Sequence, residues 1–449
     1  MRALERPFVL AVLVVAVMLV TVPGSSTLDL PRLPLLALAG ATGLWTVRVW
    51  DRVSLWLVCW PAALLLSLPG SPAPWLGGTE LARVVALVGV ILGVRELGDD
   101  AAHRLLRWVS LAVGVQVLVA LFQLGGWQGL GLPASVVQTG QDSYRVHGTL
   151  GHRNLLAGQL AATVPLVALG VSRWAALGLA GIVLVTGSLG AVLGLGAAGA
   201  CALLARLRGR ARWVLAGVLA VGAVLGVGVA LHTGASGRMP LWRVALDLGL
   251  QNPVRGVGVG QFGNAYVDGE LARLRALEVW DAGGTAARYA HDAWIHVFAE
   301  AGVPGVLGFT MTWLMPLGWA WSRARGTDLD DPRWAGLFCV VVVLGHSLVS
   351  FPLQIAGTSV VAAVGMGLAI RVSPAPVRFS WCGRLVLPLL VLLPLRFSAD
   401  RLGVAAALAL QEDRPEQAVA LAERALGQFP DEGAAAYRLG LAWWMLGER

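Results

Sequence analysis

The sequence predicts an all-α, polytopic membrane protein with about 12–13 transmembrane helices, two long outward-facing loops and a helical tail. Hydrophobic residues make up 57% of the 449 residues, and charged residues only 13%. Apolar stretches recur at lengths near the roughly 20 residues that a membrane helix needs. Arg residues gather in the short connections between these stretches, as is typical of membrane proteins.

The apolar stretches can be placed in order along the chain from their length and hydrophobicity. The predicted spans are 7–23, 33–50, 53–69, 80–96, 105–125, 154–171, 173–188, 189–206, 213–231, 294–320, 335–351, 354–371 and 384–398. So much apolar sequence excludes a soluble fold. The net charge of +8 would favour a nucleic-acid partner in a soluble protein, but here it follows from Arg in short loops, so no nucleic acid is expected.

The distribution of Arg predicts which side of the membrane each loop faces. If the N-terminus is cytoplasmic, the cytoplasmic side holds Arg2, Arg6, Arg48, Arg52, Arg95, Arg104, Arg107, Arg173, Arg206, Arg208, Arg210, Arg212, Arg323, Arg325, Arg333, Arg371, Arg378 and Arg384. The short outward loop 69–80 carries no Arg, which agrees with the positive-inside bias. Two outward loops are long, at about 126–153 and 232–292, and the Arg residues within them invite a functional explanation.

The end of the chain has a different composition. Past Asp400, charged residues alternate with Ala, and no membrane-length run follows. Residues 415–449 indicate a helix, a break at Phe429-Pro430-Asp431 and a second helix. This pattern resembles one and a half tetratricopeptide repeats, a unit that normally needs about three copies to stand alone. We therefore divide the chain into a transmembrane domain, 1–399, and a tetratricopeptide-like tail, 400–449, that packs on another surface or binds a protein partner. Thirteen spans place this tail outside, and twelve place it in the cytoplasm.

Three polar motifs lie within the two long loops or where these loops lead into the next span. The first, at 145–157, reads Arg-Val-His-Gly-Thr-Leu-Gly-His-Arg-Asn-Leu-Leu-Ala and opens the span that begins at 154. Its glycines permit close backbone approach, and Asn154 stands where a helix cap is expected.

The second motif lies in the second long loop. Arg238 is followed by Trp242 and Arg243, and then by Asn-Pro-Val-Arg-Gly-Val-Gly-Val-Gly-Gln-Phe at 252–262. The glycine run, which includes Gly258 and Gly260, is not a dinucleotide fingerprint, because no β-strand precedes it.

The third motif, at 290–305, opens the next span. It places His291 and Asp292 at the membrane entrance, followed by Trp294, His296 and Glu300. On a helix, His291 and Trp294 share a face, and His296 and Glu300 are spaced i, i+4.

In this order the three motifs resemble those of the O-antigen ligase and polymerase superfamily. The first motif matches the Arg, the Gly-containing turn and the Asn-x-x-Ala of the superfamily. The second motif matches its Arg-x-x-x-Trp and its glycine run. The third motif resembles its His-Asn-x-x-Leu followed by Glu-x-Gly. Arg153 stands where relatives commonly have Pro, and Asp292 where Asn is usual. The resemblance covers about 139–305. It implies a glycosyltransferase of the bacterial inner membrane that moves a glycan from a polyprenyl-diphosphate donor to an acceptor hydroxyl on the periplasmic face.

The residue types suit the chemistry that this resemblance implies. Guanidinium groups bind phosphate oxygens bidentately and stay charged, so Arg145 and Arg238 are the candidates for a clamp on the diphosphate. Arg153 and Arg243 are the reserves. The expected substrate-binding residues are Arg153, Asn154, Trp242, Arg243, Gly258, Gly260 and Asp292.

His291 is the candidate base that takes the proton of the attacking hydroxyl, because the pKa of imidazole lies near working pH. The alternative is that His291 only anchors a helix end. The two long loops contain no Asp-x-Asp, and no cluster of His and carboxylates has a metal spacing. The enzyme is therefore expected to need neither metal nor cofactor.

The motifs leave the acceptor open. If the acceptor is lipid A core, the protein is a ligase. If it is another glycan, the protein is a repeat-unit polymerase, and if it is a protein side chain, the protein is an O-oligosaccharyltransferase. The tail argues against a simple lipopolysaccharide ligase, because it suggests a protein partner. A transporter or flippase of lipid or glycan is the alternative of another class; it is disfavoured because the span interiors carry almost no charge and the two halves show no repeat. Membrane lipid is the remaining expected partner.

Overall fold

The computed structural model describes residues 5–20, 30–47, 50–69, 71–127, 146–207, 238–267, 287–325, 327–371 and 386–447. Every regular element in these stretches is a helix, which confirms the predicted all-α class. The α-helices are α1 Glu5–Leu19, α2 Arg32–Thr46, α3 Arg52–Ser67, α4 Pro74–Arg95, α5 Asp99–Leu124, α7 Arg153–Gly170, α8 Arg173–Val185, α9 Leu189–Arg206, α11 Met239–Gln251, α13 Ala293–Ala324, α14 Pro332–Ser347, α15 Ala356–Ala369, α16 Leu392–Gln411, α17 Pro415–Gln428 and α18 Gly433–Met445. Short 3-10 helices are η2 Pro352–Gln354 and η4 Leu387–Val391.

Helix composition makes this a multi-pass membrane protein. Within the described residues, α4, α5, α9 and α13 are long and apolar enough to cross a bilayer, and α1, α3, α8, α14 and α15 contain shorter apolar helices. At 1.5 Å per residue, the 22 residues of α4 extend about 33 Å, close to the hydrocarbon thickness of a bilayer.

The helices follow the predicted spans, with two exceptions. The span at 213–231 lies outside the described residues. The last span, 384–398, differs from the expectation where it is described: residues 387–391 form η4, and α16 then continues to Gln411. Pro388 and Pro394 lack the N–H that an uninterrupted helix needs, which explains the break at this place. The proposed domain boundary at 399 lies inside α16, so the division into domain and tail stays a prediction.

Two helices form the centre of the bundle. α4 and α15 are buried along nearly their whole length, and α2 packs closely on α4. A Cβ added to Gly43 would lie 1.9 Å from the carbonyl oxygen of Gly89, so only glycine permits this approach. Small residues of this kind are typical of helix contacts in membranes.

A break in α13 brings the glycine run against this bundle. Gly302 has a φ of 61°, and the helix kinks there. The carbonyl oxygens of Ala299 and Glu300 accept hydrogen bonds from Val257 and Gly258, at 2.8 and 3.1 Å. The loop therefore satisfies helix carbonyls next to the kink.

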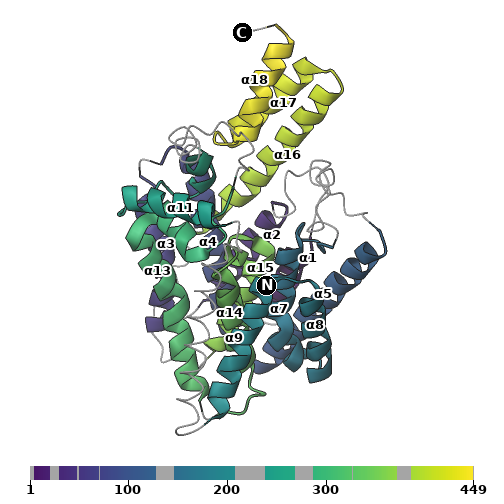
Figure 1. Ribbon diagram of the computed structural model, residues 1–449, viewed down its shortest axis with the longest axis vertical. Helices are drawn as coiled ribbons and strands as arrows, with labels where there is room; N and C mark the ends of the chain where they lie inside the picture. Colours follow the sequence, from purple (N-terminus) through teal and green to yellow (C-terminus); the bar gives the residue numbers. More distant parts are fainter. Residues whose placement is uncertain are drawn as a thin grey trace.

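The C-terminal helices α16, α17 and α18 extend from one end of the bundle, the end at which α11 lies (Figure 1). α16 packs on α2 and α4, and α17 packs on both α16 and α18. A small apolar core built mostly from alanines of α16, α17 and α18 joins the three helices. The tail thus lies on the same side of the molecule as the glycine run and the start of α13.

Candidate functional site

The first motif is held in place by glutamines of α5. The side-chain oxygen of Gln123 accepts hydrogen bonds from the backbone of His147 and Gly148, both at 2.9 Å. That of Gln116 accepts one from Thr149 N at 3.0 Å. Arg32, which is fully buried, donates to the Thr149 carbonyl at 2.6 Å. This network fixes the backbone that leads into α7.

His152 and Arg153 follow this anchored stretch. His152, and not Asn154 as the sequence suggested, caps α7, because its Nδ1 accepts the N–H of Asn154 at 3.1 Å. Burial, followed by the charges of Arg153, Arg238 and His147, lowers the pKa of His152 to about 4. Arg153 has a buried Nε that makes no hydrogen bond. Its side chain borders an apolar pocket of about 300 Å³ between α5, α7 and α8.

Arg238 stands at the start of α11. Its Nη1 donates to the carbonyl oxygen of Val349, just beyond the end of α14. Burial lowers the pKa of the Arg238 guanidinium from its usual value. Within the described part of the chain, no carboxylate forms an ion pair with this guanidinium. A half-buried cation that has no counter-ion among the described residues is suited to bind an anionic ligand.

His291 occupies a strained position immediately before α13. Its φ is 56°, a left-handed conformation that costs a residue other than glycine about 1–2 kcal/mol. The imidazole packs edge-on against the ring of Phe351, with centroids 4.6 Å apart, and its Nδ1 is buried without a hydrogen-bond partner. Burial, then the charge of Arg238, lowers the pKa of His291 to about 4. The imidazole is therefore neutral at neutral pH.

The segment after α14 joins the second and third motifs. Arg238 binds Val349, His291 contacts Phe351, and the charge of Arg238 acts on the imidazoles of both His291 and His152. Leu150 and Leu155 of the first motif pack in one apolar cluster with Phe351, so all three motifs have side chains around this segment. Arg145 lies outside the described residues.

Asp292 serves as the N-cap of α13. Its Oδ1 accepts the N–H of Ile295 at 2.8 Å. Burial raises the pKa of this carboxyl to about 6, while the hydrogen bonds from the Ile295 and Trp294 backbone act in the opposite direction. The cap uses one carboxylate oxygen, so Asp292 has a structural role. The sequence predicts a substrate-binding role in addition.

The remaining predicted residues of the second motif lie on different surfaces. Trp242 is half-buried with no partner for its indole N–H, and Arg243 is exposed on α11. Gly258 and Gly260 have φ values of 103° and 75°, and the loop that carries them packs against Ser71 and Leu76 at the start of α4. Glycine is required there by backbone conformation, so the run shapes the loop that borders α13.

Several residues near this site were not predicted from the sequence. Gln116 and Gln123 anchor the first motif, and Phe351 contacts His291. Polar residues two helical turns apart in an apolar span were the available signal for the glutamines. Nothing local marked Phe351, which lies 60 positions from His291 in the sequence.

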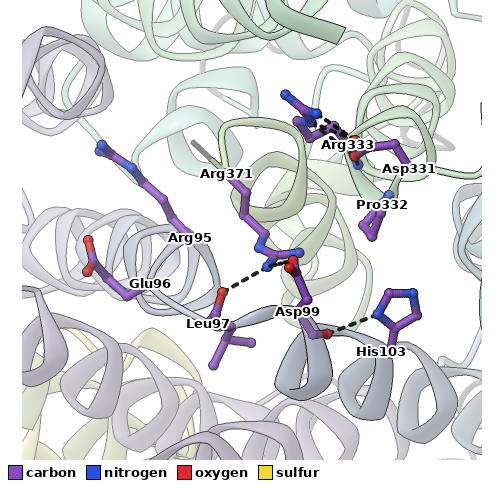
Figure 2. Close-up of a pocket in the computed structure, with 10 residues that line it drawn as sticks. Arg95, Glu96, Leu97, Asp99, His103, Asp331, Pro332, Arg333 and Arg371 are labelled. Atoms are coloured by element: carbon purple, nitrogen blue, oxygen red, sulfur yellow. Dashed lines mark hydrogen bonds and ion pairs between the residues drawn. The ribbon is translucent and has the colours of Figure 1, made fainter. Parts of the chain in front are cut away.

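A separate hollow of about 850 Å³ opens at the other end of α4 (Figure 2). Its Arg residues are matched by acids: Arg371 binds Asp99 at 2.8 Å, Arg333 binds Asp331 at 2.6 Å, and Arg95 binds Asp51 at 2.5 Å. Because these charges are balanced within the protein, the hollow has little excess positive charge for an anionic substrate.

No group of three or more His, Cys, Asp or Glu side chains in the described stretches is arranged to hold a metal ion. The positive charge of Arg238 acts on the imidazoles of His152 and His291, and a cation so close disfavours binding of a metal ion there.

Part of the site is similar to a known protein family. A search of curated proteins found no match. Residues 174–310 match the family described as O-Antigen ligase. This segment contains Arg238, the glycine run and His291, whereas the first motif and the tail lie outside it. The match therefore gives no support to the tetratricopeptide resemblance of the tail. The chain is a multi-pass membrane protein in which residues 174–310 match the O-antigen ligase family.

Proposed function

We propose that the protein transfers a glycan from a polyprenyl-diphosphate donor to an acceptor hydroxyl on the periplasmic face of a bacterial inner membrane. The main support for this proposal is that Arg238 and His291 both contact the same segment, Val349 to Phe351. A cation with no carboxylate partner among the described residues thus lies close to a neutral imidazole. This pair matches the two needs of the reaction, a stabiliser for the leaving diphosphate and a base for the hydroxyl.

In the proposed step, the acceptor oxygen attacks the anomeric carbon while its proton passes to His291. The bond between that carbon and the diphosphate oxygen breaks, and the diphosphate leaves with the electron pair. Arg238, with Arg145 as its partner in the clamp, stabilises the developing negative charge. The proton then leaves His291 for the diphosphate or for water. Arg153 and Arg243 are secondary candidates for phosphate contacts.

Because the pKa of His291 is low without a donor, the ability of His291 to take the proton depends on whether the donor is bound. Burial, and after it the positive charge of Arg238, disfavours the imidazolium, and the pKa of His291 is about 4. A bound diphosphate adds negative charge beside Arg238 and so raises the pKa of His291 towards working pH. Proton abstraction is thereby favoured when the donor is in place.

The reaction is tested with purified full-length protein in detergent, a lipid-diphosphate-linked glycan and separate acceptors. We expect transfer to one acceptor among lipid A core, a second glycan repeat unit and a protein hydroxyl. We also expect activity to be unchanged by EDTA, since the proposed clamp consists of guanidinium groups. Loss of activity in EDTA with recovery in Mg²⁺ would overturn the metal-free mechanism, and absence of transfer to every acceptor would overturn the proposed function.

The proposed orientation is tested by reporter fusions. Alkaline phosphatase fused within 126–153 or 232–292 is expected to be active, and a fusion near Arg208 inactive, because the Arg-rich loops face the cytoplasm. A fusion at Pro415 should also be active, since the tail packs on the same end of the molecule as the second long loop. Inactive fusions in both long loops would place the candidate site in the wrong compartment.

A further inference from the structure

A second polar pocket of about 370 Å³ lies beside the candidate site, at the start of α4. Its polar lining includes Glu80, His296, Glu300, Gln354, Arg396 and Glu432. Tyr289 also borders the pocket; it contacts His296 and stacks on Phe351, the ring that His291 touches. The pocket and the proposed reaction centre therefore share a wall. Its volume is within the range of small-ligand sites.

Several polar atoms in this pocket have no hydrogen-bond partner in the part of the chain that the structure describes. The Nδ1 of His296, the Oε1 of Gln354 and the Nε of Arg396 are buried and make no hydrogen bond. One Glu300 oxygen accepts the Phe262 N–H at 3.1 Å, and the other lies 3.6 Å from His296 Nε2. Buried polar atoms are normally satisfied, so these point to a ligand that can both donate and accept.

The charges in the pocket select the class of this ligand. The charge of Glu80 is balanced by Arg83, but Glu300 and Glu432 would repel a phosphate, while Arg288 and Arg396 would repel a cation. An apolar ligand would leave the partnerless atoms unsatisfied. A neutral molecule rich in hydroxyl groups fits the mixture, because each hydroxyl donates to a carboxylate or accepts from a guanidinium.

The C-terminal tail builds part of the pocket wall. Asp431, in the turn between α17 and α18, accepts the N–H groups of Trp75 and Leu76 at 2.6 and 3.2 Å. The residue before α4, Ala73, has no side chain that could cap this helix, so the tail supplies the cap. Phe429, fully buried, packs edge-on against Trp75. These contacts hold the tail on α4 and place Glu432 at the pocket.

We propose that this pocket binds a sugar residue of one of the two transfer substrates, and that the tail completes it by docking on α4. The proposal rests on the proposed function, in that the sugar belongs to a glycan being transferred or extended. Donor glycan and acceptor glycan present the same hydroxyl chemistry. The experiment distinguishes them by the substrate whose KM changes.

The test compares Gln354→Leu, Glu432→Gln and Asp431→Ala with wild type in the purified transfer assay. The first two each remove a hydrogen-bonding or charged group from the lining, and the third removes the cap that docks the tail. We expect the KM of one substrate to rise about tenfold, as for one lost hydrogen bond, with kcat and the other KM nearly unchanged. Glu423→Gln, exposed on α17, is the matched control. If all three variants stay within twofold of this control for both KM values, the inference is wrong.

A binding measurement separates this inference from the proposed function. Saturation-transfer NMR on the full-length protein in micelles uses D-glucose, D-galactose, N-acetyl-D-glucosamine and L-rhamnose as probes. We expect saturation of at least one sugar, and its loss in Gln354→Leu. If wild type transfers no glycan, a Gln354-dependent signal still upholds the pocket, and the absence of any such signal overturns it.

Discussion

Arg238→Ala is expected to lower glycan transfer by roughly a hundredfold to a thousandfold, the range for removing one electrostatic stabiliser of a transition state. The structure gives Arg238 a carbonyl contact with Val349 and, among the described residues, no carboxylate partner. Its loss leaves the charge of the leaving diphosphate uncompensated. Arg145→Ala should have a similar effect. Lys at either position should rescue only in part, because an ammonium group does not bind phosphate bidentately.

The measurement is transfer per unit of membrane-inserted protein, with Arg104→Ala as the control for loss of a surface Arg. Arg104 is exposed on α5, at the end of the molecule that carries the charge-balanced hollow. The control should transfer normally. Normal transfer by well-expressed Arg238→Ala would remove this residue from the proposed clamp.

His291→Ala is expected to slow transfer by roughly a hundredfold or more, the usual effect of losing a general base. Donor binding should survive because the Arg clamp is untouched. His291→Gln separates two roles, since Gln can form hydrogen bonds but cannot take the proton. Near-normal turnover in the Gln variant would show that His291 only positions the acceptor.

The dependence on pH offers a second check on His291. A base must be unprotonated to act, and the pKa of free His291 is about 4. The kcat/KM of wild type should therefore be constant from neutral pH down to about pH 5 and fall as pH drops through 4. A fall centred near pH 6 would instead implicate Asp292, whose pKa is raised to about 6. Asp292→Asn would then abolish that fall.

The sequence alone was sufficient for the fold class. Membrane helices are set by the length and hydrophobicity of continuous segments, so the spans from 33–50 to 189–206 were close to α2 through α9. The last span was the exception, because Pro388 and Pro394 break the helix while leaving hydropathy high. Motif order likewise indicated the family that the match at 174–310 supports.

Only the tertiary structure decided how the polar residues group. Arg238 and His291 contact the same segment, Val349 to Phe351. Glu432 lines the same pocket as Glu80, which lies more than 300 residues earlier in the chain. No local pattern encodes such a pairing. It depends on how helices pack, and on the kink at Gly302 that lets the glycine run lie against α13. Hydrophobic length is a property of one segment, whereas a binding site is a property of several segments brought together, and this is why the spans could be predicted and the second pocket could not.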